Sequence, residues 1–426
     1  ILVRPHVGIL AWFWVGLMNP HRQAWGSLEN LRYALMIAAA TLLAWVLSRE
    51  SKRIPVTLVT VMLGLFTIWI SLTTVMAHHP ADAFPSLVQA LKILLMTFVA
   101  VALINTRERI YALVWLMVVC LGFYGFQGGV FTILTGGEYH VFGPPRSFIA
   151  DNNQLALALI MILPFIAYLY QQAAHPIARI GLIGLGVMSV FSIIGSQSRG
   201  AFLALCLMGL FLAANSRYRL RMGVAVLAMA AVGAMFVPQS WVDRMETIQN
   251  AGEDKSVQGR FQAWQFAYEV ARDNPITGGG FNVHFDETYY KTLVPEAEKN
   301  RNFHSVYFEV LGEQGFVGLA IFLALMGGTW LTFGHVIRAT RSEPELRWAH
   351  DLGRMGQVSL LGYASAGAFL NLAFFDLYYL VVALAVMAAD QVHVARAVNA
   401  PSSHRRRAPV HASSWSPSGS PAPSSQ

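Results

Sequence analysis

Residues 154–215 read QLALALIMILPFIAYLYQQAAHPIARIGLIGLGVMSVFSIIGSQSRGAFLALCLMGLFLAAN, and three apolar runs fill almost all of this stretch. The runs cover residues 154–171, 178–197 and 200–215, and only short polar segments separate them. An α-helix rises about 1.5 Å per residue, so about 20 apolar residues cross the ~30 Å hydrocarbon core of a bilayer. The stretch therefore predicts three successive transmembrane helices.

The same pattern recurs along the rest of the chain. Of the 426 residues, 55% are hydrophobic and 12% are charged, and the mean hydropathy is +0.48. A soluble domain carries about 25% charged residues, so this chain has too little polar surface to face water on all sides. It predicts an all-α integral membrane protein with about twelve transmembrane helices. The expected spans lie near residues 6–19, 31–48, 55–76, 85–105, 110–135, 154–171, 178–197, 200–215, 222–238, 305–334, 354–372 and 376–396.

Lysine and arginine are distributed unequally between successive loops. With the N-terminus in the cytoplasm, the basic clusters all fall inside, and the short outside loops keep few cations, as the positive-inside rule requires. The net charge of +7 comes from these clusters, which argues for contact with membrane lipids and against a nucleic-acid partner. Both chain ends are then expected in the cytoplasm. The inside clusters are Arg49, Lys52 and Arg53; Arg107 and Arg109; Arg217, Arg219 and Arg221; Arg338, Arg341, Arg347 and Arg354; and Arg405 to Arg407.

Two segments do not read as membrane spans. Residues 239–304 form a large outside loop, and residues 400–426 form a Ser/Pro-rich tail that we expect to be disordered and cytoplasmic. The expected organisation is helices 1–9 over residues 1–238, the loop over 239–304, helices 10–12 over 305–399, and the tail.

The loop contains one helical pattern. Phe261, Trp264, Tyr268 and Ala271 recur at helical spacing within residues 259–275, and the segment ends in Asp-Asn-Pro, which stops a helix. We therefore expect the loop to be partly helical and to pack on the membrane surface.

Three side chains near the outside surface are the main candidates for chemistry. Arg199 lies between two apolar runs with almost no loop, and a cation at membrane depth costs about 2.5–3.5 kcal/mol unless it has a partner or a purpose. Arg260 stands where the loop helix should begin, and a guanidinium there suits a phosphate. His304 opens the next span and can accept a hydroxyl proton near neutral pH. Topological anchoring, a solvated charge and a structural histidine are the alternative interpretations.

Other polar residues are secondary candidates. Arg146 and Asn152 lie in the outside loop 136–153, where prolines and Asn residues favour a rigid turn. Lys92 is alone inside a span, and Tyr307 follows His304. Further polar positions are Asp376, between the last two spans, and the pair His78-His79, for which no third metal ligand is evident. We expect no metal site and no cofactor, so arginines would have to neutralise any bound diphosphate.

Several motifs, taken together with their order along the chain, resemble those of the O-antigen ligase and polymerase superfamily. The N-terminal Met18–Arg22 segment and the stretch from Gly143 to Asn153 are similar to exosortase-associated O-glycosylation ligases. The superfamily motifs are Ser196-Gln197-Ser198-Arg199-Gly200-Ala201, Gly259-Arg260, Asn274-Pro275-Ile276-Thr277-Gly278-Gly279-Gly280, and His304-Ser305 followed by Glu309 and Gly312-Glu313-Gln314-Gly315.

The resemblance implies a multi-span glycosyltransferase of the GT-C type in the bacterial inner membrane. Such an enzyme takes a glycan from undecaprenyl diphosphate on the periplasmic side and passes it to lipid A-core oligosaccharide, without metal or cofactor. By this resemblance His304 is the catalytic base, and Arg199, Arg260 and Arg146 bind the donor diphosphate. Lys92, Asn152 and Tyr307 are expected to contact substrate. Direct displacement of the diphosphate implies inversion at the anomeric carbon.

Three other functions compete with this one. An O-antigen polymerase uses the same donor with a second lipid-linked glycan as acceptor, and a protein O-oligosaccharyltransferase transfers the glycan to protein. A twelve-span secondary transporter belongs to another class, but transporters usually have similar halves and charges near the bilayer midplane. Neither feature is visible here.

Overall fold

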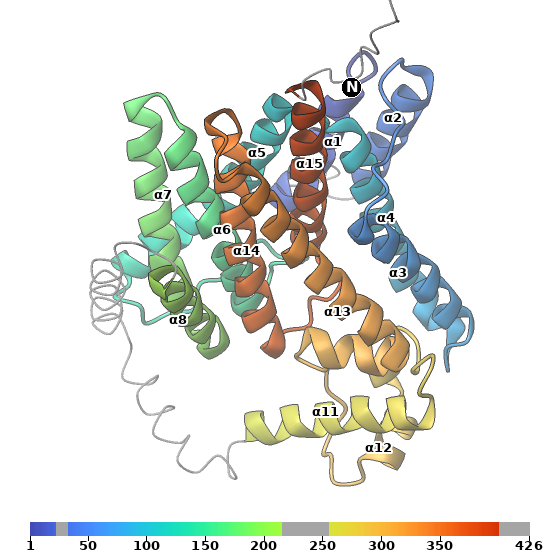
Figure 1. The fold of residues 1–426 in the computed structure, drawn as a ribbon. Coiled ribbons are helices and arrows are strands. Elements are labelled where there is room, and N and C mark those ends of the chain that lie inside the picture. The colour runs from blue at the N-terminus through green and yellow to red at the C-terminus, as the bar shows by residue number, and fades with distance from the viewer. Residues whose placement is uncertain (23–32, 215–254, 400–426) are drawn as a thin grey trace, which may run out of the picture.

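The computed structural model describes residues 1–22, 33–214 and 255–399, and every regular element in these ranges is a helix (Figure 1). The α-helices are α1 (Pro5–Met18), α2 (Tyr33–Leu47), α3 (Leu58–Val75), α4 (Pro80–Leu103), α5 (Arg107–Leu134), α6 (Asn152–Gln172), α7 (Pro176–Gly195), α8 (Arg199–Ala214), α11 (Lys255–Asp273), α12 (Glu287–Leu293), α13 (Val306–Thr340), α14 (Arg347–Ala366) and α15 (Asp376–Asn399). Short 3-10 helices are η1 (Pro20–Arg22), η4 (Val283–Phe285), η5 (Pro344–Leu346) and η6 (Gly367–Phe369).

The long helices support a multi-span membrane protein. Seven of the described helices are long and apolar enough to cross a bilayer: α3, α4, α5, α6, α7, α13 and α15. Three further apolar helices, α1, α2 and α8, are shorter. The expected span at 222–238, the first part of the outside loop and the tail at 400–426 lie outside the described residues. Each of the other expected spans overlaps a helix.

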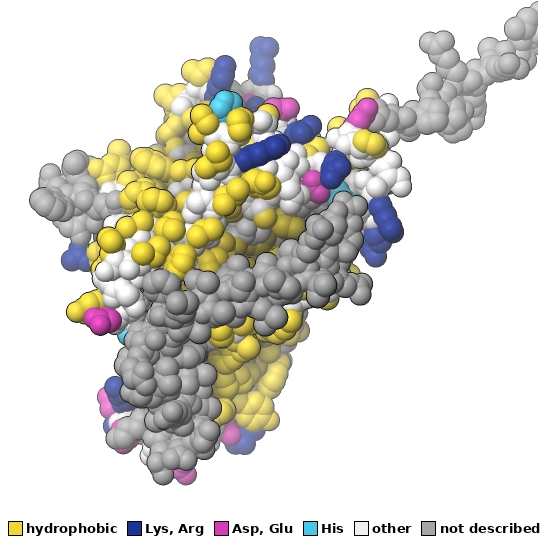
Figure 2. All heavy atoms as spheres, turned by 90° about the vertical axis from the view of Figure 1, so that its left-hand side faces the viewer, with side chains coloured by type: hydrophobic (Ala, Val, Ile, Leu, Met, Phe, Trp, Pro, Cys, Tyr) yellow, Lys and Arg dark blue, Asp and Glu magenta, His cyan; other side chains and the backbone are white. Residues whose placement is uncertain are grey.

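The surface of the bundle is suited to lipid. On the face seen in Figure 2, hydrophobic side chains dominate the middle of the molecule, and most charged side chains lie toward its upper and lower ends. Helix α7 illustrates this, because Ile177, Ile180 and Ile183 are all exposed on it. Large apolar side chains can face outward in this way when the solvent is hydrocarbon.

Helices α15 and α6 form the centre of the bundle. Residues 377–388 of α15 are all buried, as is most of α6. Helix α13 packs against α3, α14 and α15, and α11 lies across the end of the bundle beneath α13 (Figure 1). We refer to this end as the α11 end. The N-terminus lies at the opposite end.

Local sequence explains where the helices begin. The Thr57 and Asp151 side chains accept backbone hydrogen bonds in capping boxes at the starts of α3 and α6, and the Thr106 side chain accepts from Arg109 N at the start of α5. Pro80 and Pro176 occupy the first positions of α4 and α7, where a missing N–H costs nothing.

Two expectations need correction. Helix α14 begins at Arg347 rather than near residue 354, because its first turns bury Trp348 and Leu352 while Arg347 and Arg354 stay exposed. Helix α11 is present, but its buried face is formed by residues 263, 266, 267, 270 and 271. Phe261 and Tyr268 are exposed instead, since the packed stripe is rotated from the one that the aromatic spacing suggested.

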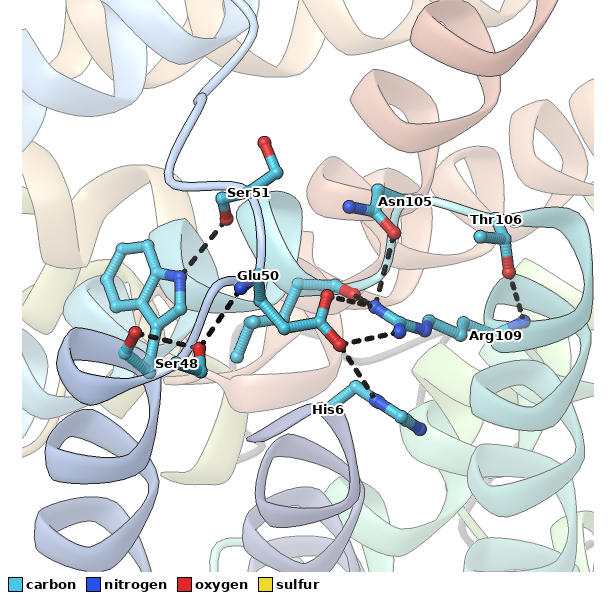
Figure 3. Close-up of polar contacts among 9 residues, drawn as sticks. His6, Ser48, Glu50, Ser51, Asn105, Thr106 and Arg109 are labelled. Atoms are coloured by element: carbon cyan, nitrogen blue, oxygen red, sulfur yellow. Dashed lines mark hydrogen bonds and ion pairs between the residues drawn. The ribbon is translucent and has the colours of Figure 1, made fainter. Parts of the chain in front are cut away.

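An ion pair fastens the end of the bundle opposite α11 (Figure 3). The Arg109 guanidinium donates to both carboxylate oxygens of Glu50, at 2.9 and 2.7 Å, and also to the Leu103 carbonyl at 2.7 Å. His6 lies 3.7 Å from the same carboxylate. The hydrogen bonds from Arg109 hold the pKa of Glu50 below its ordinary value. Residues from α1, the α2–α3 loop and α5 are joined at this point.

A bend in α13 attaches the α11 end to the bundle. Gly315 has φ 71° and ψ −175°, a conformation available almost only to glycine, and it interrupts the helical hydrogen bonds. The carbonyls released by the bend accept from other segments: Gly312 O from Gly279 N at 2.9 Å, Glu313 O from Gly280 N at 2.9 Å, and Gln314 O from the Trp69 indole at 3.0 Å. No carbonyl of these three is left without a donor.

Candidate functional site

His304 lies in the short segment that leads from the α11–α12 region into α13. Its neighbour Phe303 is fully buried, with its ring centroid 6.2 Å from that of Phe266 and 5.1 Å from that of His284. The Phe303 carbonyl accepts a hydrogen bond from the Trp264 indole at 2.8 Å. Phe303 therefore anchors the segment in a small apolar cluster, and this anchor fixes where the next residue stands.

The surroundings of His304 are mainly positive. Burial lowers the pKa of its imidazole, the positive charges of Arg260 and Arg301 lower it further, and the negative charge of Asp151 acts in the opposite direction. The ring is therefore neutral at pH 7 and keeps a nitrogen lone pair that can accept a proton. Because these effects decline with distance, Arg260, Arg301 and Asp151 all lie in the neighbourhood of the imidazole.

Arg301 explains the glycine that precedes Arg260. A Cβ atom placed on Gly259 would lie 2.5 Å from the Arg301 guanidinium carbon. The guanidinium of Arg301 therefore passes directly over the backbone of α11 at Gly259. This close approach brings the side chains of Arg260 and Arg301 to the same part of the site.

Arg199 is the first residue of α8, after a tight turn. Gln197 in this turn has φ 54°, and the Ser196 carbonyl accepts a hydrogen bond from Asn152 Nδ2 at 2.7 Å. The start of α6, which also carries Asp151, is thereby tied to the start of α8. The Asn152 side chain holds the turn rather than standing free.

The short helix η6 connects the start of α8 with the start of α13. A Cβ atom on Gly200 would lie 3.2 Å from the Phe369 side chain, and one on Gly367 would lie 3.2 Å from Val306. Gly200, next to Arg199, and Val306, two residues after His304, thus contact the same three-residue helix. The structure places Arg260 near His304 at the α11 end, and η6 links the backbone that follows Arg199 with the backbone that follows His304.

The secondary candidates are placed differently. Arg146 is exposed in the loop before α6, and Tyr307 donates a hydrogen bond to the Ala364 carbonyl at 2.7 Å in the first turn of α13. Lys92 is exposed on α4, twelve residues after the helix start at Pro80, which is about 18 Å along the axis. His79 contacts Asp286 at 2.8 Å.

Backbone strain concentrates in the site motifs. Of the non-glycine residues described, five have a positive φ, and three of them are Arg146 (58°), Gln197 (54°) and His304 (49°). Such conformations cost about 1–3 kcal/mol and persist only where the surroundings enforce them, commonly at functional sites.

The sequence did not predict that Arg301 lies near His304, or that the carboxylate of Glu313 holds the backbone at Asn282. This side chain is 4% exposed, and its Oε1 accepts from Asn282 N at 3.0 Å. Arg301 stands three residues before His304, and this short spacing could have predicted that Arg301 lies near the imidazole. Nothing in the linear sequence pairs Glu313 with Asn282.

These features define a multi-span helical membrane protein with a histidine among arginines at one end of its bundle. Residues 183–323, about a third of the chain, match a family model described as O-antigen ligase, which supports the O-antigen ligase superfamily that the motifs predicted. Residues 1–174 match a second model, described as a family of unknown function (DUF5935). None of the curated proteins searched matches the chain.

Proposed function

We propose that this protein is an O-antigen ligase that transfers a glycan from undecaprenyl diphosphate to lipid A-core oligosaccharide at the periplasmic face of the inner membrane. The observation that carries the proposal is a partly buried histidine with Arg260 and Arg301 near it at one end of a membrane bundle. In this proposal the α11 end faces the periplasm, and the arginine-rich loops at the other end face the cytoplasm, as the positive-inside rule requires.

The reaction needs an acceptor for one proton. A hydroxyl oxygen of the acceptor sugar attacks the anomeric carbon of the donor glycan, and its proton passes to the neutral imidazole of His304. The new glycosidic C–O bond forms as the bond between the anomeric carbon and the diphosphate oxygen breaks. A displacement of this kind inverts the configuration at the anomeric carbon.

The reaction also needs positive charge to receive the departing diphosphate. Arg199, Arg260 and Arg301 provide guanidinium groups, which bind phosphate oxygens through paired N–H donors and stay protonated throughout. Gly200 packs against η6, and Arg301 packs over Gly259, so the backbone beside these arginines is fixed before the donor arrives and little reorganisation is required. Burial lowers the pKa of His304, and the positive charges of Arg260 and Arg301 lower it further, so these two arginines serve both needs.

The assay is transfer by the purified full-length chain, supplied with lipid-linked glycan and lipid A-core. We expect product on the lipid A-core in the wild type, and at least a 100-fold loss in His304→Ala, within the range attributed to general bases. His335 is an exposed histidine on α13, so the variant His335→Ala is the matched control and should transfer glycan at the wild-type rate.

Other outcomes would redirect or end the proposal. Growth of glycan on undecaprenyl diphosphate without lipid A-core would identify a polymerase, and glycan on a protein acceptor would identify a protein O-oligosaccharyltransferase. Uptake of a solute into vesicles without any transfer would identify a transporter. A His304→Ala variant as active as His335→Ala would eliminate His304 as the base.

A further inference from the structure

A second polar region lies at the end of the bundle opposite α11. The C-terminal part of α13, the helix η5 and the first turns of α14 surround a cavity of about 1060 Å³. Arg338, Arg341, Arg347 and Arg354 line it together with His350. The positive-inside rule accounts for arginines in a loop, but it does not require them to converge on one cavity.

The charges in this cavity are unbalanced. Glu343 and Asp351 are its acidic residues, and Glu343 is already paired with Arg396 at 2.7 Å. Asp351 accepts from Gln172 at 3.2 Å and has Arg347 at 3.9 Å. The guanidinium groups of three lining residues make no hydrogen bond or ion pair within the described ranges: Arg338, Arg341 and Arg354.

The other wall of the cavity is apolar. Phe211 and Leu212 of α8, together with Met355 and Val358 of α14, line it. The Phe211 ring lies 5.8 Å from that of Trp330, about two turns of α13 before Arg338, so this wall extends toward the middle of the bilayer. The cavity is thus cationic at the membrane surface and hydrophobic farther in.

We infer that this cavity binds an anionic phospholipid of the leaflet opposite the candidate active site. The phosphate of the headgroup would contact Arg338, Arg341 and Arg354, which make no hydrogen bond or ion pair in the described part of the chain, although the charge of Arg354 acts on Asp351. The acyl chains would lie along the apolar wall. Basic pockets between transmembrane helices bind anionic headgroups in this manner. A free phosphate ion would satisfy the arginines but would leave the apolar wall unused. The inference does not depend on the proposed transfer reaction.

Native mass spectrometry of the purified full-length chain tests this site. Phosphatidylglycerol and phosphatidylcholine are titrated separately in detergent, and inorganic phosphate is added in a third arm. We expect phosphatidylglycerol to bind at least tenfold more tightly than phosphatidylcholine, and inorganic phosphate to displace it poorly. Equal binding of the two lipids, or displacement by phosphate at matched concentration, would overturn the assignment.

Variants locate the binding. The triple variant R338Q/R341Q/R354Q should weaken phosphatidylglycerol binding by about fivefold for each arginine, or on the order of 100-fold in total. The matched control, R49Q/K52Q/R53Q, removes three charges from the α2–α3 loop at the same end and should bind as the wild type does. Equal losses in both variants would contradict a specific site.

A measurement on the unaltered chain covers the case in which the triple variant does not fold. A phosphatidylglycerol with a photoactivatable group in its acyl chain is crosslinked to the wild type, and the labelled peptides are identified. Label should concentrate on residues 211–212 and 355–358. Label spread evenly over the lipid-facing helices would refute the inference.

Discussion

The bend in α13 depends on one residue, and Gly315→Ala tests whether the candidate site depends on the bend. The added Cβ would lie 2.3 Å from the Ile276 carbonyl oxygen, an atom of the backbone that cannot rotate away. The φ of 71° with ψ of −175° is itself strained for alanine by about 1–3 kcal/mol.

The displaced backbone would weaken further interactions. Ile276 lies between Pro275, whose carbonyl accepts from Phe316 N at 3.0 Å, and the glycines that bond to Gly312 and Glu313. Each such hydrogen bond contributes about 0.5–1.5 kcal/mol. With one or two of them lost, we expect Gly315→Ala to lower the free energy of unfolding by about 2–5 kcal/mol.

Thermal unfolding in detergent and glycan transfer are measured side by side. Gly327→Ala is the matched control, because it lies on the same helix and a Cβ there meets nothing within 4 Å. Gly315→Ala should unfold at a lower temperature and transfer more slowly than the control at a temperature where both are folded. Identical unfolding and transfer in the two variants would refute the account of the bend.

Three further predictions concern the site and the opposite end. The transfer rate should fall as the pH drops through the pKa of His304, which lies below 6.5. Arg260→Gln removes a positive charge, so it should move the acidic limb of the kcat/KM profile to higher pH. If the acidic limb stays where it is, the charge of Arg260 does not act on His304. Gly259→Ala should displace the Arg301 guanidinium and raise the KM for donor while the unfolding temperature stays the same, and an unchanged KM would remove Arg301 from the site. Glu50→Gln should lower the free energy of unfolding by about 1–3 kcal/mol without changing kcat, and an unchanged unfolding midpoint would contradict the contribution of its ion pair with Arg109.

The helices were largely predictable because hydrophobic runs report directly on burial in lipid. The start of α14 was not predictable, because Arg347 and His350 are residue types common in loops. Only the structure shows that Trp348 and Leu352, next to them in the sequence, form a buried face of a helix. For α11 the existence of a helix was predictable but its orientation was not. Aromatic side chains such as Phe261 and Tyr268 can face a core or a membrane surface, and their spacing is the same in both cases.

The candidate site was predictable at residues whose type is unusual for their location. Arg199 and His304 are polar groups at the boundary of apolar runs, and that contrast is visible in a linear sequence. Arg301 and Asp151 are common residue types in polar loops, so only the fold shows that they surround the imidazole. The same holds for the cavity beside Arg341, because no sequence pattern shows that α8 supplies its apolar wall.

The left-handed backbone at His304 has a consequence for how this position can change. Glycine adopts a positive φ without steric cost, whereas histidine holds it only at the expense of folding free energy. Substitution by glycine would relax the segment and remove the imidazole in one step, so stability and chemistry pull in opposite directions here. A library of variants selected for heat resistance alone should enrich His304→Gly, and a library selected for glycan transfer should exclude it.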